Sequence, residues 1–125
     1  MSDLSGISPT YGEYIRFVEL LSQERVGYTN LSLYRGSPQP VAQITRYRAD
    51  YGGGEWRAQD TLVIGEEKTR FEINYASETT SDRLPRSLAR VLDIFRDALT
   101  TDGAVISIQQ TGDRFESRNG HWVRL

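Results

Sequence analysis

The chain has 125 residues, the size of one ordinary domain, and we expect a single domain over residues 1–125 with a flexible N-terminal stretch over residues 1–9. It has no cysteine and one histidine, His121, which excludes disulfides, thiolate nucleophiles and multi-histidine metal sites. Fifteen basic and 17 acidic residues give a formal charge of −2, which argues against a dedicated binder of duplex DNA or anionic membranes. No apolar run is long enough to span a membrane and residues 1–10 lack a signal-peptide pattern, so we expect a cytoplasmic protein.

The first predicted element is a helix over residues 11–25. Thr10 and Glu13 are spaced as in a capping box, and apolar residues then recur at helical spacing along one face. Gly27 follows, and because glycine adopts the left-handed conformation without strain, we expect it to end the helix.

Strands are predicted next because the period of the apolar pattern changes to two. Leu31 and Leu33 alternate with polar residues and should face the core. A flexible glycine loop at residues 52–54, a bulge at Asp60 and a charged turn over residues 65–68 interrupt the pattern. The strands expected in this half of the chain cover residues 28–35, 41–49, 56–64 and 70–76.

A second helix is the strongest prediction from the pattern. Ser81 or Asp82 can cap it, and Pro85 is tolerated only because it lies in the first turn. The apolar stripe that runs to about residue 100 comprises Leu84, Leu88, Val91, Leu92, Phe95 and Leu99. Its regular spacing predicts an amphipathic helix with one buried face.

The chain is expected to close on a small antiparallel meander. A strand over residues 105–110 is followed by Asn119-Gly120, the signature of a type I′ hairpin joining residues 114–118 to 121–125. We therefore expect an α+β fold, mainly an antiparallel sheet of about six strands with two amphipathic helices on one face, in the order α-ββββ-α-ββ(β). The sheet face opposite the helices is then available for function.

Aromatic and arginine side chains interleave along the first three predicted strands. Tyr, Trp and Arg are the residue types enriched at the centres of protein interfaces, and single-stranded nucleic acid binders use similar stacking platforms. Ordinary sheet packing of arginine stems over aromatic rings explains the same pattern without any function. The candidate binding residues are Tyr28, Tyr34, Arg35, Arg46, Tyr47, Arg48, Tyr51, Trp56 and Arg57.

Catalytic signals are weak. Asp60 with Glu66-Glu67-Lys68 has the residue types of a metal-dependent nuclease, but the short spacing around Gly65 favours an exposed charged turn. His121 has no evident nucleophile partner. The glycine loop 52–54 lacks the residues of a phosphate-binding loop, although it could close over a ligand. We assign no catalytic residue, no metal site and no cofactor.

The sequence alone favours a non-enzymatic protein-binding domain, such as an immunity protein or an effector-chaperone-like module, whose partner is a basic protein. An unpaired sheet edge would also allow a homodimer. We expect no membrane or nucleic-acid partner. The alternatives are a small-molecule or nucleotide-binding domain and, less favoured, a single-stranded nucleic acid binder or a Mg²⁺-dependent enzyme.

Overall fold

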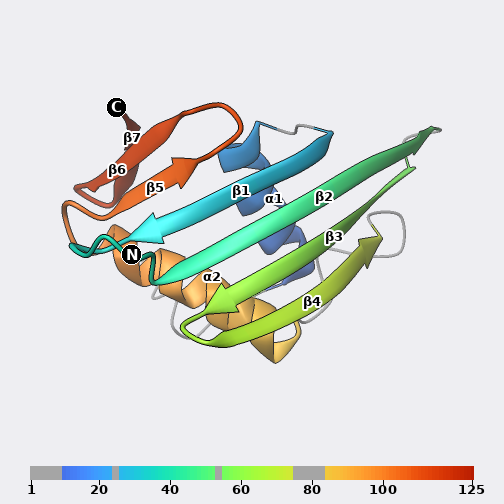
Figure 1. The fold of residues 1–125 in the computed structure, drawn as a ribbon, viewed down its shortest axis with the longest axis horizontal. Helices are drawn as coiled ribbons and strands as arrows, with labels where there is room; N and C mark the ends of the chain where they lie inside the picture. The colour runs from blue at the N-terminus through green and yellow to red at the C-terminus, as the bar shows by residue number, and fades with distance from the viewer. Residues whose placement is uncertain (1–9, 24–25, 53–54, 75–83) are drawn as a thin grey trace.

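The structure is a computed structural model that describes residues 10–23, 26–52, 55–74 and 84–125. Its elements are α1 (Tyr11–Ser22), β1 (Gly27–Tyr34), β2 (Ala42–Gly52), β3 (Glu55–Ile64), β4 (Glu67–Asn74), α2 (Arg86–Leu99), β5 (Val105–Ile108), β6 (Arg114–Arg118) and β7 (His121–Arg124). The strands form one antiparallel sheet in the order β4-β3-β2-β1-β5-β6-β7 (Figure 1). The predicted fold class and element order are confirmed, with seven strands in the sheet instead of about six.

Helix α1 begins where the sequence predicts and ends earlier. The backbone N–H of Glu13 donates a hydrogen bond of 3.2 Å to Oγ1 of Thr10, which is the expected N-cap. The helix ends at Ser22 because Gln23 adopts the left-handed conformation at φ 61° and its N–H bonds to a carbonyl of the last turn. The predicted stop at Gly27 is therefore wrong, and Gly27 is instead the first residue of β1. Residues 24–25, at the end of the predicted helix, lie outside the described part of the chain.

The register of the central strands places apolar side chains in continuous rows beneath the helices. Leu31 of β1 is opposite Ile44 of β2 on one side and Ile108 of β5 on the other, and all three are buried. The expected inward direction of Leu31 and Leu33 is thus confirmed. These rows form the core side of the sheet.

The bulge expected at Asp60 is not there. The β2–β3 ladder passes through Asp60 in regular register, opposite Arg46, and the irregularity lies between Asp50 and Gly52. Asp60 keeps the regular strand geometry because its carboxylate points into the core, where it has a partner. Residues 53–54 of the glycine loop are outside the described residues.

Helix α2 buries the predicted apolar stripe against the sheet and α1. Phe95 contacts Phe17 of α1 edge to face, with ring centroids 5.1 Å apart. The helix begins at Arg86, and its N-cap is Pro85, which provides no side-chain hydrogen bond. The expected caps Ser81 and Asp82 lie outside the described residues. The buried side chains on this side of the helix are Leu84, Leu88, Val91, Leu92, Phe95 and Ala98, whereas Leu99 of the predicted stripe is only partly buried.

The C-terminal meander extends the sheet beside β1. Asn119 and Gly120 both have positive φ, at 53° and 78°, which confirms the predicted type I′ turn between β6 and β7. Because β5 pairs with β1, the last three strands lie beside the first strand instead of the fourth.

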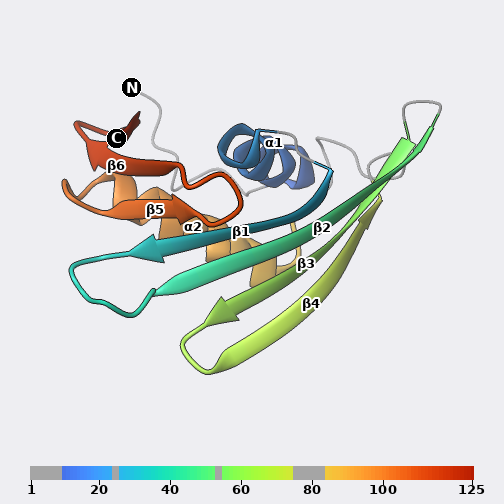
Figure 2. The same cartoon turned by 45° about the horizontal axis from the view of Figure 1, so that its top comes forward.

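Both helices lie on the same side of the sheet. In Figure 1 they pass behind the strands, and Figure 2 shows α1 alongside the sheet after a turn of the same view. No described helix covers the opposite side, which we call the outer face. The outer face is therefore a broad surface built from all seven strands.

Candidate functional site

The nine side chains expected to form one binding surface do not lie together. The alternation that buries Ala42 and Ile44 continues along β2, so the arginines that follow in the same phase also point inward. The outer face carries Tyr28, Tyr34, Tyr47, Tyr51 and Arg57, the core side carries Arg46, Arg48 and Trp56, and Arg35 follows the end of β1.

Four of these residues cluster at one end of the outer face. Tyr28 and Tyr47 are cross-strand partners whose ring centroids lie 4.8 Å apart, and 63% and 44% of their surfaces are exposed. Tyr51 is 66% exposed, and the guanidinium of Arg57 lies 5.3 Å from the centre of its ring. We call Tyr28, Tyr47, Tyr51 and Arg57 the tyrosine patch. Tyr34 is on the same face at the far end of β1, where it is half-buried opposite Val105.

The charges of the outer face are distributed away from this patch. Gln59 and Glu72 continue the row of Tyr28 and Tyr47 across β3 and β4, so Arg57 is the only cation of the described residues within the patch itself. The basic side chains of the described outer face are Arg57, Lys68, Arg70, Arg114 and Arg118, and the acidic ones are Glu72 and Glu116. This face is therefore locally basic although the whole chain carries a net charge of −2.

Arg46 and Trp56 are buried and cannot contribute to an accessible surface. Only 2% of Arg46 is exposed, and its Nε and Nη2 groups each donate a hydrogen bond of 2.8 Å to the carboxylate of Asp60, which is fully buried. The hydroxyl of Tyr14 from α1 donates a third, also of 2.8 Å, to the same carboxylate. Arg48 is half-buried, with its guanidinium 4.3 Å from the ring centre of Trp56 and 3.2 Å from Glu19 of α1.

The pKa values of Tyr14 and Arg46 are both shifted by their buried surroundings. Burial raises the pKa of the Tyr14 hydroxyl well above its ordinary value, and the negative charge of Asp60 raises that pKa further. Burial alone would lower the pKa of Arg46, but the hydrogen bonds and charge of Asp60 outweigh it and the pKa is raised. Arg46 therefore stays charged and Tyr14 stays protonated, which makes the group a fixed structural link instead of an acid–base pair.

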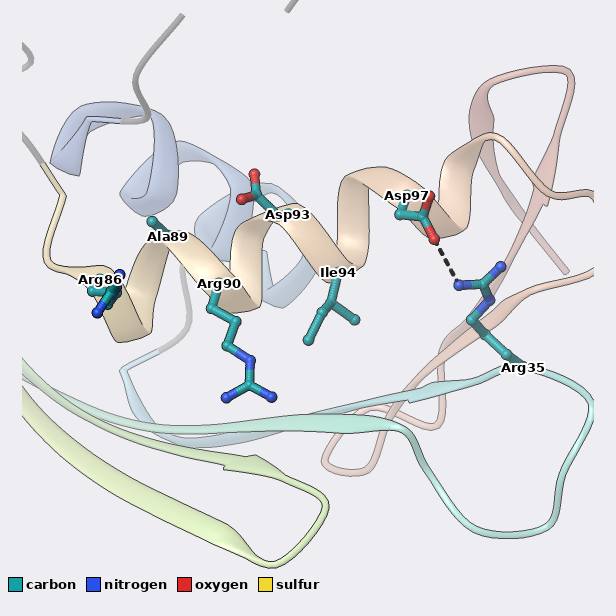
Figure 3. Close-up of a pocket in the computed structure, with 7 residues that line it drawn as sticks. All are labelled: Arg35, Arg86, Ala89, Arg90, Asp93, Ile94 and Asp97. Carbon is teal, nitrogen blue, oxygen red and sulfur yellow. Dashed lines mark hydrogen bonds and ion pairs between the residues drawn. The ribbon is translucent and has the colours of Figure 1, made fainter. Parts of the chain in front are cut away.

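A groove of about 660 Å³ runs along α2. Figure 3 shows Arg90 and Ile94 extending from the helix toward the sheet, while Arg35 reaches across to Asp97. The groove is lined by Arg35, Arg86, Ala89, Arg90, Asp93, Ile94 and Asp97.

The chemistry of this groove is that of a mixed-charge surface. Arg35 pairs with Asp97 at 2.8 Å and Arg90 pairs with Glu67 at 2.7 Å, so two of its three arginines already have carboxylate partners. Arg86, the third arginine of the lining, forms no ion pair with a described residue. The lining has no hydroxyl, imidazole or thiol that could act as a nucleophile.

The residues considered for catalysis do not converge. Asp60 is held in the core by Arg46, whereas Glu66 is exposed in the two-residue turn between β3 and β4 and Lys68 projects from the outer face. His121 is exposed at the start of β7. In the described parts of the chain, no three His, Asp or Glu side chains gather closely enough to hold a metal ion.

Comparison with protein-family models, with curated proteins and with solved structures finds no match to this chain. Neither described helix is long and apolar enough to cross a membrane. In the described part of the chain, the tyrosine patch on the outer face and the groove along α2 are candidate binding places.

Proposed function

We propose that the protein is a non-enzymatic protein-binding module of the cytoplasm and that the tyrosine patch is the centre of its interface. The observation that carries this proposal is the exposed Tyr28–Tyr47 pair on a sheet face that no described helix covers. Tyrosine is enriched among the residues that dominate binding energy because it combines a large apolar ring with a polar hydroxyl. Immunity proteins and effector chaperones are examples of such modules.

The packing of the patch favours tight binding. The two rings already contact each other at 4.8 Å, and Tyr51 is held beside Arg57, so little side-chain freedom is lost when a partner docks. Side chains on neighbouring strands of a sheet are also fixed relative to one another by the backbone ladder. The patch therefore resembles a preorganised hot spot.

The charge of the outer face favours a partner with an acidic surface. The net charge of the whole chain predicts a basic partner, but on the outer face of the described strands there are five basic side chains and two acidic ones. The basic residues of β4 and β6 on the described outer face, such as Arg70 and Arg114, would attract a negatively charged partner and orient it toward the patch.

A single-stranded nucleic acid is the second candidate because the outer face combines exposed aromatic rings with an excess of basic side chains. Its weakness lies in the patch itself, where the row of Tyr28 and Tyr47 continues into Gln59 and Glu72 instead of cations. Stacked bases need cationic groups beside the rings to hold their phosphates. The geometry therefore ranks the protein partner first.

Affinity purification of the tagged protein from its native host tests the proposal. The Tyr28→Thr/Tyr47→Thr variant keeps residues that suit a strand and removes both rings, and Val123→Thr on β7 is an uncharged control elsewhere on the outer face. We expect the wild type and the control to retain the same stoichiometric protein and the patch variant to retain at least about tenfold less. Equal retention by all three proteins would contradict the proposal, and patch-dependent retention of nucleic acid, seen by ultraviolet absorbance, would support the second candidate instead.

A further inference from the structure

The edge of the sheet at β4 has backbone groups available for another strand. β4 pairs with β3 on one side, and no strand in the described residues lies on its other side. An exposed edge of eight residues presents a row of N–H and C=O groups that can pair with another chain. The side chains of β4 determine which second strand can pair with this edge.

The register of the β3–β4 hairpin identifies the free backbone groups. Its two-residue turn closes at the pair Ile64–Glu67, which makes that pair the hydrogen-bonded type, and the two types alternate along the ladder. Thr69, Phe71 and Ile73 therefore direct their backbone groups to β3. The groups of Lys68, Arg70 and Glu72 point away from β3 toward the free edge.

The side chains of this edge are complementary to themselves. If two antiparallel copies of β4 pair with Phe71 opposite Phe71, Arg70 of each copy is opposite Glu72 of the other. Shifting the register by two residues in either direction, the smallest shift that keeps both outer faces on one side, places Arg70 opposite Arg70 or Glu72 opposite Glu72. The Phe71-centred register brings together opposite charges without a like pair, and it also makes Arg70 and Glu72 a hydrogen-bonded pair, as their free backbone groups require.

The monomer leaves these side chains available for such pairing. Arg70 and Glu72 are exposed, and neither forms an ion pair with a described residue. Phe71 is only half-buried at the edge of the core. In the Phe71-centred register the two phenyl rings would face each other across a closely spaced pair and shield each other from water.

The opposite edge of the sheet lacks this complementarity. β7 has four residues, and its charged or titratable side chains are His121 and Arg124, with no carboxylate on the strand. Two copies of β7 would form no cross-strand pair of opposite charges, and Arg124 already pairs with Asp113 of its own chain. The charge pattern therefore selects β4.

We propose that two copies of this chain dimerise by pairing β4 with β4 in the Phe71-centred register. The two-fold axis runs perpendicular to the sheet, so the sheet continues from one copy into the other, with the helices of both copies on one side and both outer faces on the other. The dimer would present two tyrosine patches on one surface. This inference rests on the β4 edge and is independent of the proposed function of the patch.

Charge reversal at the edge tests the dimer and its register together. Arg70→Glu places two carboxylates opposite each other in both cross-strand pairs, and Glu72→Arg places two guanidinium groups there, so each variant alone should dimerise roughly tenfold or more weakly than the wild type. Mixed in equal amounts, the two variants regain opposite charges in both pairs. Sedimentation velocity and native mass spectrometry over a range of concentrations measure both effects.

The expected result is a wild-type dimer, two variants that are monomeric alone and a heterodimer in their mixture. Arg114→Glu makes the same charge change on the outer face of β6 and should leave the wild-type dimer intact. Circular dichroism establishes that all variants are folded. A monomeric wild type, or a dimer that the single charge reversals do not weaken, would overturn the proposal even if the tyrosine patch binds its partner.

Discussion

The guanidinium of Arg46 and the carboxylate of Asp60 form two parallel hydrogen bonds of 2.8 Å inside the core, between β2 and β3 and beneath α1. The ring centroids of Tyr14 and Trp56 lie 5.9 and 5.7 Å from the guanidinium carbon of Arg46. The cation is therefore flanked by aromatic rings as well as by its countercharge. Because Tyr14 also donates to Asp60, the pair links α1 to the middle of the sheet. The helical layer is thus positioned by a buried polar contact as well as by apolar packing.

Removing one partner of this pair should lower the free energy of unfolding far more than removing both partners together. Arg46→Met leaves the carboxylate of Asp60 buried without its countercharge and should lower the free energy of unfolding by about 3–5 kcal/mol. The triple variant Arg46→Met/Asp60→Leu/Tyr14→Phe removes the charges together with the hydroxyl that depends on them, and should recover most of that loss. Urea unfolding followed by circular dichroism measures both values. A loss below about 1 kcal/mol in Arg46→Met would show that the pair does not hold the core together.

The buried Tyr14 hydroxyl should make the free energy of unfolding decrease at alkaline pH. Burial raises the pKa of Tyr14 in the folded protein well above the ordinary value of 10.0, so the unfolded chain loses this proton first as pH rises. The stabilisation is complete below about pH 10 and is lost progressively above it. Tyr14→Phe should be less stable than the wild type by about 1–3 kcal/mol at pH 8 and should lose less stability between pH 9 and pH 11.

Urea unfolding at a series of pH values checks this dependence. Tyr28→Phe removes an exposed hydroxyl from the outer face and is the matched control, which should follow the wild-type curve. If Tyr14→Phe and the wild type lose the same free energy of unfolding as pH rises, the buried hydroxyl does not cause the effect.

The type I′ turn between β6 and β7 depends on glycine at its second position. Gly120 has φ 78°, so Gly120→Ala places a side chain in a conformation that L residues rarely adopt and should cost about 1 kcal/mol or more. Asn119→Gly keeps positive φ accessible and should change stability much less. Thermal unfolding of the two variants compares them directly, and equal melting temperatures would contradict the requirement for glycine at this turn.

The elements with regular apolar patterns were predictable from the sequence. The stripe of α2 and the alternation of Leu31 and Leu33 each place hydrophobic residues on one face, and burial of that face determines the element and its direction. The Asn119-Gly120 turn was predictable because few residue pairs adopt its backbone conformation. In these places the local preference and the global fold agree.

The candidate surface is less predictable because arginine side chains mostly lie at the protein surface, so an arginine in a strand is expected to face solvent. Arg46 continues the inward phase of Ala42 and Ile44, a signal present in the sequence, but a buried arginine is stable only when a distant partner is known. That partner, Asp60, is 14 residues away, and Tyr14 comes from a helix on the other side of the core. The end of α1 is also hard to predict from the sequence. Gln23 ends the helix in the left-handed conformation, which is more common for glycine.

Site-specific photocrosslinking in the native host tests most directly whether the tyrosine patch is the binding surface. A benzoylphenylalanine residue replaces Tyr47 in one protein, Ala89 in the α2 groove in a second and Val123 at the far end of the outer face in a third. The proposed function predicts a discrete protein adduct from position 47 and none from position 89 or 123. An adduct that forms at position 89 and not at position 47 would contradict it and would place the binding surface along α2.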